Sequence, residues 1–422
     1  EYDTLEEELK KLDSDNYVLK LVGSTPSEGE KVEHAQKMLS LDKTYVRDDL
    51  KKWIDQRETV SMFKIDGVSC SLIYEKGRLV MAKTRGDGVV GQKITDKVYW
   101  MSDVPKEIPN TDGLAEVRGE LYCREKDFFY LSEEMVERGL EKPTNQRNIV
   151  AGLLGRKENL SLARYISFQA FEILDEELKV KTEMQKFDEI KRLKIDTPDI
   201  TLHKDTKEID RVIDEAQNFM AEGNYQIDGL VFVYNHLEYQ NDLGETTHHP
   251  RYKIAFKFEG ETKTTAIKNI QWQVSRNGVL TPVAYVDKVE LSGAEISRVT
   301  LHNYGMVKQF ELKKGDKIKI VRSGEVIPKF ISVVEESSQE ISIPKECPVC
   351  LSPVETVDIR LYCSNPKCPA RIREGILNFI RKIGIDDISS KRLDELIDKG
   401  LVTEIPDLYR LEREDFYKLE KV

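Results

Sequence analysis

Four of the six cysteines in this chain fall between residues 347 and 368, in the spacing C-x2-C-x12-C-x4-C. Two close pairs of thiolates joined by a short loop can surround one Zn²⁺ tetrahedrally, and such a closed site has no position for a reactive water. So short a segment has little apolar core of its own, which disfavours four reduced cysteines without a metal. Cys70 and Cys123 stand alone in strand-like runs and are expected to be buried thiols in a reducing compartment. The sequence therefore predicts a structural zinc site at Cys347, Cys350, Cys363 and Cys368.

The length of 422 residues predicts about two to four domains, and a hydrophobic content of 39% suffices for ordinary buried cores. No apolar run approaches the roughly 18–20 residues that span a bilayer, and the start lacks the basic and apolar regions of a signal peptide. We therefore expect a soluble chain that is not exported. Because the first residue is Glu1 and the end carries no helix-ending signal, we also expect a piece of a longer protein.

The pattern of apolar residues changes along the chain. Leucines spaced for a helix occupy residues 1–20, and a stretch rich in Ser, Thr, Pro and Gly then breaks that pattern. From Val60 to about Lys257, short β-rich runs alternate with helical stretches at 125–139 and 205–222. This alternation predicts a large α+β domain with mostly antiparallel strands. No G-x-G-x-x-G string follows the first strand, so the sequence does not support a Rossmann fold.

The segment from about 262 to 340 contains strands punctuated by Asn-Gly and Ser-Gly turns, with no helical period, which predicts a small β-barrel. Helix-like segments at 372–383 and 389–399 come after the cysteines. The barrel segment is basic on an acidic chain, since residues 262–332 hold 12 Lys+Arg and 6 Asp+Glu while the whole chain has a net charge of −11. A polyanion can dock where the local field is positive, although a well-solvated barrel surface explains the same count.

The string Lys64-Ile65-Asp66-Gly67 is the strongest candidate for a catalytic motif. A lysine at the edge of a β-rich pocket can lose its proton through desolvation or a neighbouring cation, and it then becomes a nucleophile. Taken alone, the same string also describes a β-turn with a solvated lysine. A lysine that attacks phosphorus needs cations for the phosphate oxygens and a carboxylate for the ribose or a metal. The chain supplies both in Arg85, Arg118-Gly119-Glu120, Asp228-Gly229 and Lys257.

In this order the motifs resemble the nucleotidyltransferase series shared by polynucleotide ligases and capping enzymes. Longer strings narrow the resemblance to the bacterial-type NAD-dependent DNA ligase family, and they cover nearly the whole chain. The strings, in family order, are KMLSLDKTY, TRGDGVVGQKIT, VRGELY, NQRNIVAGLLGRK, LTPVAYVDKVELSGAEISRVTLHN, GDKIKIVRSGEVIPK and CPVC…YCSNPKCPAR. A capping-type transferase that uses ATP or GTP would share the lysine motif but not the cysteine cluster.

The resemblance implies a multidomain α+β architecture. The expected parts are the C-terminal part of a helical module that recognises nicotinamide mononucleotide (NMN) at 1–25, a nucleotidyltransferase (adenylation) domain at 26–261, an OB-fold β-barrel at 262–340, a four-Cys zinc finger at 341–370 and the truncated start of a helix-hairpin-helix domain at 371–422. That hairpin departs from the usual Gly-Leu-Gly, because Asp386-Asp387-Ile388-Ser389-Ser390 stands in its place.

The resemblance also implies a role for each matching residue. Lys64 would take AMP from NAD, and Lys257 would stabilise the charge on the α-phosphate. Asp228 would place a metal ion or orient the lysine, with Asp66 as a further catalytic residue. The cofactor-binding set would be Ser40 and Leu41 for adenosine, Glu120 for the ribose, Arg85 and Arg147 for phosphate, and Tyr2 and Asp3 in the NMN module.

For the whole protein, the resemblance implies a ligase that seals nicks in double-stranded DNA through a lysyl-AMP and a DNA-adenylate, releasing NMN and AMP. It would use NAD, Mg²⁺ or Mn²⁺, and structural Zn²⁺. It would act as a monomer, unless a second subunit completes the enzyme. It would work in the cytoplasm, either at the nucleoid of a bacterium or, for a viral protein, in the host cell. The barrel would hold DNA through Arg276, Lys288, Arg298 and Arg322.

Two departures from the family fall inside the expected pocket. Met62 stands where the family has an acidic residue that reads the adenine amino group, and Val233 stands where a lysine follows Asp228. Lys253 shares a face with Lys257 if their strand is regular, which makes Lys253 our candidate substitute for the missing cation. The alternative is a ligase-like DNA-binding accessory protein or subunit with weakened or lost catalysis.

Overall fold

The computed structural model describes residues 30–417 except 110–112, 144, 176–177, 259, 292–293, 324–327 and 386–387, together with Leu9, Leu12 and Leu419. Tyr2, Asp3 and most of the segment 1–25 therefore lie outside the described residues. The chain divides near residue 260 into two compact units, and each is described by itself. Within the described ranges, no helix has the length and apolar character needed to cross a membrane.

Two sheets form the centre of the first unit. One contains, in spatial order, β2 (Asp42–Thr44), β11 (Lys253–Lys257), β10 (Ile227–Tyr234), β3 (Thr59–Ile65) and β9 (Ile200–His203). The other contains β5 (Arg78–Thr84), β4 (Val68–Glu75), β7 (Leu114–Tyr122) and β8 (Ser167–Asp175). A separate ribbon pairs β1 (Lys31–Glu33) with β6 (Val90–Gln92). All these pairs are antiparallel except β2 with β11, so the prediction of mostly antiparallel strands is confirmed.

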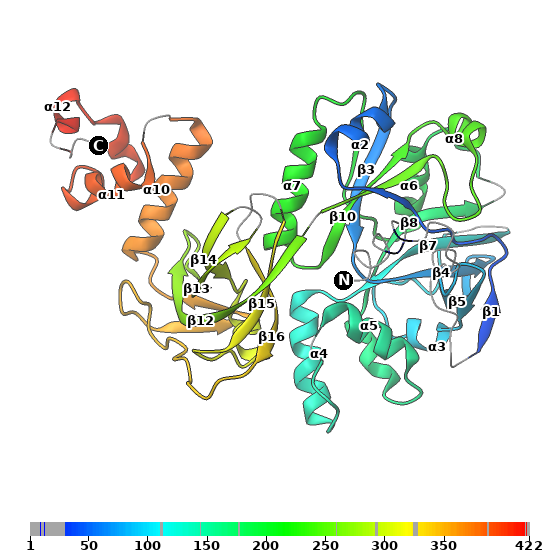
Figure 1. Cartoon of the computed structure of the whole chain (residues 1–422), viewed down its shortest axis with the longest axis horizontal. Coiled ribbons are helices and arrows are strands. Elements are labelled where there is room, and N and C mark those ends of the chain that lie inside the picture. Colours follow the sequence, from blue (N-terminus) through cyan, green and yellow to red (C-terminus); the bar gives the residue numbers. More distant parts are fainter. Residues whose placement is uncertain are drawn as a thin grey trace. The chain divides into compact units, whose positions relative to one another are not determined.

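Helices accompany these sheets. They are α2 (Arg47–Ile54), α3 (Thr95–Val98), α4 (Glu125–Glu137), α5 (Gln146–Gly155), η2 (Leu160–Tyr165), α6 (Glu183–Arg192), α7 (Ile209–Glu222) and α8 (Leu237–Leu243). The helical stretches predicted at 125–139 and 205–222 correspond to α4 and α7. Apolar residues at 209, 212, 213 and 216 give α7 one buried face, and with α2 it packs on β10 and β11 (Figure 1). This core fixes the strands that carry the candidate site.

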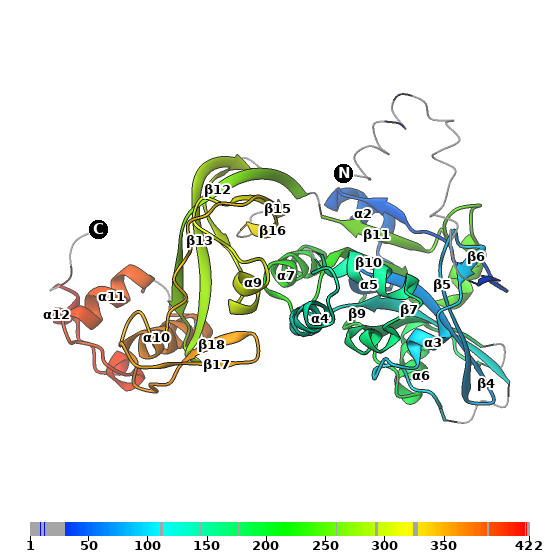
Figure 2. The same ribbon diagram turned by 90° about the horizontal axis from the view of Figure 1, so that it is seen from below.

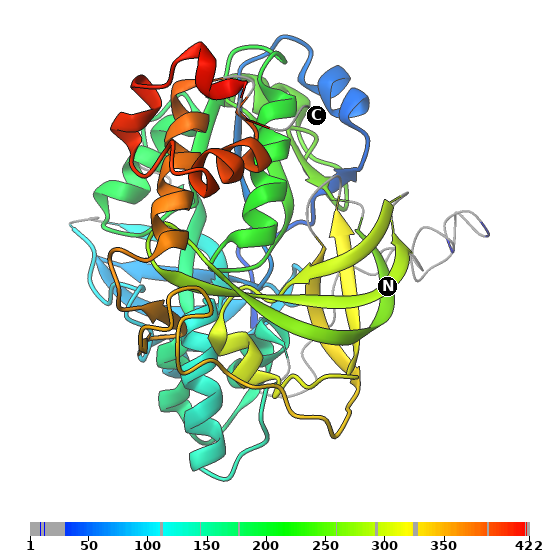
Figure 3. The same ribbon diagram turned by 90° about the vertical axis from the view of Figure 1, so that its left-hand side faces the viewer.

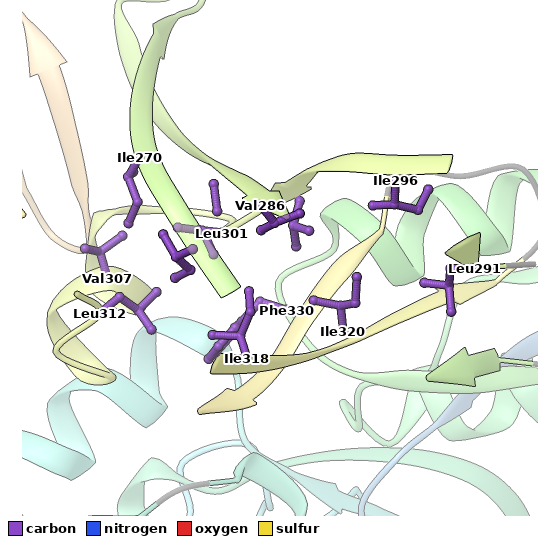
Figure 4. Packing of buried hydrophobic residues seen from close by; sticks show 13 residues of the cluster. Ile270, Val286, Leu291, Ile296, Leu301, Val307, Leu312, Ile318, Ile320 and Phe330 are labelled. Carbon is purple, nitrogen blue, oxygen red and sulfur yellow. The ribbon is translucent and has the colours of Figure 1, made fainter. Parts of the chain in front are cut away.

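The second unit contains the predicted barrel. Its strands are β12 (Gly260–Val274), β13 (Val279–Leu291), β14 (Ala294–Thr300), β15 (Lys317–Ser323) and β16 (Lys329–Glu335). Figure 2 shows that β12 and β13 are long and strongly curved. Alternating residues point inward, and Ile270, Val286, Ile318 and Phe330 meet in one apolar core (Figure 4).

One helix in the barrel segment was not predicted. α9 (Tyr304–Gln309) follows β14, and the side chain of Asn303 caps it by accepting a hydrogen bond from the backbone N–H of Met306 at 3.1 Å. The barrel prediction did not include this helix. A helix of six residues is too short to show a helical period in the sequence.

The cysteine segment and a set of helices complete the second unit. β17 (Val354–Val357) pairs with β18 (Arg360–Cys363), which also pairs with β13. α10 (Pro369–Ile383) and α11 (Ser390–Asp398) correspond to the helices predicted at 372–383 and 389–399, and η3 (Ile405–Tyr409) and α12 (Arg413–Phe416) follow. These helices, orange to red in Figure 3, share a small apolar core formed by Ile376, Ile380, Leu393 and Leu396. Asp386-Asp387 of the expected hairpin lies outside the described residues.

Candidate active site

Lys64 lies near the end of β3, just before the chain passes into the other sheet. Asp66 and Gly67 alone link β3 to β4. Gly67 packs directly on β7, because a Cβ at this position would stand 2.1 Å from the carbonyl oxygen of Leu121. So close an approach requires a residue without a side chain. The K-x-D-G string therefore holds Lys64 and Asp66 at the junction of the two sheets.

A carboxylate from β10 and a second amine from β11 meet the Lys64 amine. Lys64 Nζ lies 3.1 Å from Asp228 Oδ2 and 3.0 Å from Oδ1, and Lys257 Nζ lies 3.6 Å from Asp228 Oδ2. Asp228 sits in a β-bulge, a feature that redirects a side chain, and Gly229 stands directly opposite both lysines. The three side chains are 20–29% exposed, so a ligand can reach them. The structure thus brings three of the predicted catalytic residues together.

Asp66, the fourth predicted catalytic residue, faces a cation from α5. Arg147 Nη1 lies 3.1 Å from Asp66 Oδ1. Asn145 caps α5 by accepting hydrogen bonds from the backbone N–H groups of residues 147 and 148, which fixes the turn that carries Arg147. Burial raises the pKa of Asp66, and the charge of Arg147 opposes that shift. Arg147 is 59% exposed and can also meet an incoming anion.

Glu120 reaches the same place from β7, directly opposite Ser69 of β4. Ser69 Oγ donates a hydrogen bond to Glu120 Oε2 at 2.6 Å, and the backbone N–H of Arg85 donates to the carbonyl oxygen of Ser69 at 2.9 Å. Burial raises the pKa of Glu120 to about 7, while the Ser69 hydrogen bond and the charge of Lys64 act in the opposite direction. Sequence reasoning missed Ser69, because only the register between β4 and β7 shows which carboxylate it faces.

The two departures from the family lie inside the sheet that carries Lys64. Met62 is 5% exposed and stands opposite Val231 of β10. Val233 is fully buried, and its partner on β11 is Lys253. β11 keeps a regular register, so Lys253 shares a face with Lys257 as expected. β10 thus has a valine in place of the expected cation, and a substitute role for Lys253 on the adjacent strand stays a prediction.

Lys253 binds a carboxylate of the other sheet. Its Nζ lies 2.5 Å from Glu172 Oε1. Arg118 Nη1 lies 3.3 Å from Glu172 Oε2, and Arg118 Nε lies 2.8 Å from Glu116 Oε1. Burial acts to raise the pKa of Glu172, but Lys253 and Arg118 lower it to about 2. These four residues, called the Glu172 network below, have side chains only 5–14% exposed and balance their charges.

Arg118 also connects the Glu172 network to the segment before β2. Its guanidinium donates to the carbonyl oxygens of Gln36 at 2.6 Å and Lys37 at 3.1 Å. Ser40 follows, and its backbone N–H donates to the carbonyl oxygen of His248 at 3.2 Å. The structure therefore places Ser40 and Leu41 just before β2, and their contact with adenosine stays a prediction.

The four clustered cysteines converge in the second unit. Their Sγ atoms all lie within 4.8 Å of one another, with 3.9 Å between Cys347 and Cys368 and 3.5 Å between Cys350 and Cys363. A tetrahedral zinc ion with bonds of about 2.3 Å to sulfur requires sulfur atoms about 3.8 Å apart. Hydrogen bonds from Ser352 lower the pKa of Cys350 to about 6, whereas burial raises the pKa values of Cys363 and Cys368. The predicted cluster is confirmed, and its donor set fits a closed metal site.

The four cations predicted to hold DNA are spread over the barrel. Arg276 is exposed in the turn between β12 and β13, and Arg298 is exposed on β14. Lys288 Nζ lies 2.7 Å from a carboxylate oxygen of Glu295, which offsets its charge. Arg322 belongs to β15, but its side chain is not among those described. Arg276 and Arg298 are therefore the stronger candidates.

Known proteins match this chain along nearly its whole length. Residues 27–261 match the NAD-dependent DNA ligase adenylation domain, and residues 264–342 match the NAD-dependent DNA ligase OB-fold domain. A DNA ligase from Lactobacillus gasseri is 34% identical over 96% of this chain and 64% of its own length. A DNA ligase from Bacillus subtilis is 33% identical over 100% of this chain and 67% of its own length.

Among solved structures, the ATP-dependent DNA ligase from bacteriophage T7 in complex with ATP is 14% identical over 69% of this chain and 96% of that chain, with a TM-score of 0.34. The chain spans 64% of the length of the Lactobacillus relative. The two family matches follow the predicted order, and the expected resemblance is confirmed. The chain belongs to the NAD-dependent DNA ligase family, with its adenylation domain, its OB-fold and a four-cysteine cluster after the barrel.

Proposed function

We propose that this chain is the catalytic part of an NAD-dependent DNA ligase. The observation that carries the proposal is the Lys64 amine held 3.0 Å from Asp228, with the Lys257 amine 3.6 Å from the same carboxylate. The Lys64 nitrogen attacks the α-phosphorus of NAD, so that an N–P bond forms, the P–O bond to NMN breaks and the amine loses its proton. AMP then passes to the 5′-phosphate at a nick in duplex DNA, and the 3′-hydroxyl displaces it.

The neighbours of Lys64 support this chemistry. Lys257 shares the Asp228 carboxylate with Lys64, so a second cation faces the same site. Asp228 can orient the amine and accept its proton, and Lys257 can then stabilise the charge that develops on the α-phosphate. Asp66 holds Arg147 beside this centre until a phosphate binds.

The remaining predicted residues bind NAD around Lys64. Glu120 accepts hydrogen bonds from ribose hydroxyls, and Arg85 and Arg147 contact phosphate oxygens. The expected contacts with adenosine and with NMN are Ser40, Leu41, Tyr2 and Asp3. Use of NAD in place of ATP rests on family membership and on the NMN module.

Mg²⁺ or Mn²⁺ fits the carboxyl groups beside Lys64. Asp228 Oδ1 is buried and, apart from its ion pair with Lys64 Nζ at 3.0 Å, accepts no hydrogen bond from the described residues, and these cations prefer carboxylate oxygens as ligands. Asp228 would hold such an ion, which when bound would shield phosphate charge.

Zn²⁺ fits the four cysteines and would serve only structure, because the four thiolates leave no open position. We predict one zinc ion per chain by elemental analysis. Chelation should unfold the 347–368 segment, because apart from the metal its buried apolar core is limited to the cysteines and Leu361 packed on Val274 and Leu280 of the barrel. A metal-free protein that protects the amide hydrogens of this segment from exchange would contradict the assignment.

Nicked double-stranded DNA is the proposed polymer substrate. An OB-fold tracks nucleic-acid backbones with basic side chains, and Arg276 and Arg298 offer exposed cations for this purpose. We further propose that the protein acts as a monomer in the cytoplasm of a bacterium, or in the host cell of a virus.

Intact-mass analysis after incubation with NAD and Mg²⁺ tests the first step. The longest natural form of the protein should gain the mass of one AMP from NAD, gain none from ATP, and gain none when it carries Lys64→Ala. Joining of a nicked duplex with a 5′-phosphate is then the second test. No adduct with either nucleotide would contradict the proposal.

A second candidate function is a ligase-like DNA-binding subunit without catalysis. The buried apolar side chains of Met62 and Val233, where the family has charged residues, favour it. This alternative predicts binding to nicked DNA without the AMP adduct, so the same two assays separate the two functions.

A further inference from the structure

Ser69 links two parts of the proposed nucleotide site. It lies on β4, which runs between β5 and β7 in its sheet. Its hydroxyl donates to Glu120 Oε2 across the β4–β7 pair at 2.6 Å. On the other side, its carbonyl oxygen accepts from the backbone N–H of Arg85 at 2.9 Å, where the chain leaves β5. One residue therefore touches both the predicted ribose ligand and the backbone of a predicted phosphate ligand.

The Glu120 side chain is confined from two directions. A Cβ at Gly67 would stand 3.1 Å from Glu120 Cγ, so the backbone of the K-x-D-G passage packs against the side chain. The Ser69 hydroxyl then binds Oε2. One carboxylate oxygen is thus committed to the protein, and the other can accept a hydrogen bond from a ligand hydroxyl. A fixed carboxylate loses little freedom when a ligand binds.

The charge state of Glu120 depends on the same contact. The charges of Lys64, Asp66 and Arg85 act on the Glu120 carboxyl group, and Cys70 is its buried neutral neighbour on β4. Burial favours the protonated acid, whereas a donated hydrogen bond and nearby cations favour the carboxylate. The ionised group accepts hydrogen bonds through both oxygens, but the protonated group is itself a donor. The Ser69 hydroxyl therefore favours the ionised form, whose other oxygen can accept a hydrogen bond from a ribose hydroxyl.

We infer that Ser69 is a positioning residue that holds Glu120 ready to accept hydrogen bonds from nucleotide hydroxyls and fixes the Arg85 backbone beside it. The nucleotide part of this inference rests on the proposed function. The contact between Ser69 and Glu120 is independent of that function and can be tested separately.

Steady-state joining of nicked DNA at varied NAD concentration, between pH 5.5 and 9, provides the first test. Ser69→Ala should raise KM for NAD roughly tenfold with a smaller change in kcat, because a hydrogen bond to a charged group is lost. It should also move the acid limb of kcat/KM to higher pH. Ser69→Thr, which keeps a hydroxyl, should restore both. A normal KM and acid limb in a folded Ser69→Ala protein would overturn the inference.

Ser71→Ala is the matched control. Ser71 lies two residues further along the same face of β4, and its hydroxyl donates to Glu116 Oε1 at 2.8 Å. The control therefore removes an equivalent hydroxyl–carboxylate hydrogen bond from the same strand. It should leave the acid limb unchanged. An equal shift in both variants would show a general loss of structure and would count against a specific role of Ser69.

Carbon-13 NMR of carboxyl-labelled glutamates tests the contact between Ser69 and Glu120 separately from the proposed function, since it needs no nucleotide. The Glu120 signal is assigned with Glu120→Gln, and its titration is compared in the wild type and Ser69→Ala. A higher Glu120 pKa in the variant supports the inference even if the wild type forms no AMP adduct, and that result would reject only the proposed function. Equal titration curves would overturn the inference whatever the adduct assay gives.

Discussion

Strand β11 carries a lysine at each end, and the two lysines have different surroundings. Lys257 shares Asp228 with Lys64, and these side chains remain 20–29% exposed. Lys253 binds Glu172, which also binds Arg118, and these side chains are 5–14% exposed. The same residue type on the same strand face thus occurs once at a ligand-accessible centre and once inside a nearly closed ion network.

The balance of charge explains the difference. In the Glu172 network two cations meet two carboxylates, so no charge remains for a ligand to satisfy. Around Lys64, the three cations Lys64, Lys257 and Arg147 meet two carboxyl groups, those of Asp228 and Asp66. An anion such as a phosphate is attracted to the second arrangement and not to the first. We therefore propose a catalytic role for the Lys257 end of β11 and a structural role for the Lys253 end.

Of the changes proposed, Glu172→Ala should have the largest effect, a loss of folding stability at the Lys253 end of β11. It leaves the Lys253 ammonium in a nearly buried position without its partner, and loss of one partner of a buried pair costs about 3–5 kcal/mol. Urea unfolding should show this loss. A destabilisation comparable to that of an exposed pair, about 0–1 kcal/mol, would contradict the contrast between the two ends.

Lys257→Ala should slow the transfer of AMP from NAD to Lys64. Removal of one positioned donor from a developing oxyanion costs about 10²–10³ in rate, or about 2.7–4 kcal/mol of transition-state stabilisation. Single-turnover transfer of AMP from NAD measures this rate, and the urea midpoint should change little. Lys93→Ala is the control, because Lys93 forms a more exposed ion pair with Glu30 in the same unit. Equal rates in the two variants would contradict the catalytic assignment.

The pH dependence of stability should sharpen the comparison. The pKa of Glu172 is about 2 in the folded protein, below the value of about 4.3 for an unfolded glutamate. The folded state therefore binds fewer protons, and the stabilisation from Glu172 is complete above about pH 4.3 and is lost as the pH falls toward 2. Between pH 5.5 and 3, wild type should lose about 1–2 kcal/mol more stability than Glu172→Gln. Parallel curves in urea unfolding would contradict the prediction.

Much of this architecture could be predicted from local sequence. The spacing of Cys347, Cys350, Cys363 and Cys368 predicted a cluster because ligands close in the chain stay close in space. The apolar periods predicted α4, α7, α10 and α11, whose buried faces repeat over several turns. α9 was missed because six residues give no repeat and its cap lies in one side chain, Asn303.

The contacts of the candidate site depended on register, which no local pattern shows. Ser69 meets Glu120 because β4 and β7 pair in that register, although the residues are 51 positions apart. Likewise, Glu172 came from a strand whose pairing gave no signal in the sequence, and it binds Lys253 across 81 positions. The sequence could identify the Lys64 string as a candidate, but it could not show which carboxylates surround each lysine.

The double variant Glu172→Gln/Lys253→Met should have the smallest effect and decides the role of Lys253. It removes both charges of the pair while roughly keeping the volume of the side chains, and such replacements of buried ion pairs are often nearly neutral. We expect a loss of about 1 kcal/mol or less in urea unfolding and no marked change in the rate of AMP transfer. If Lys253 instead substitutes for the lysine that Val233 replaces, the rate should fall by about 10²–10³ at nearly unchanged stability. The double variant tests this more cleanly than Lys253→Ala, because the single change leaves the Glu172 carboxylate short of a partner and mixes a rate effect with a loss of structure.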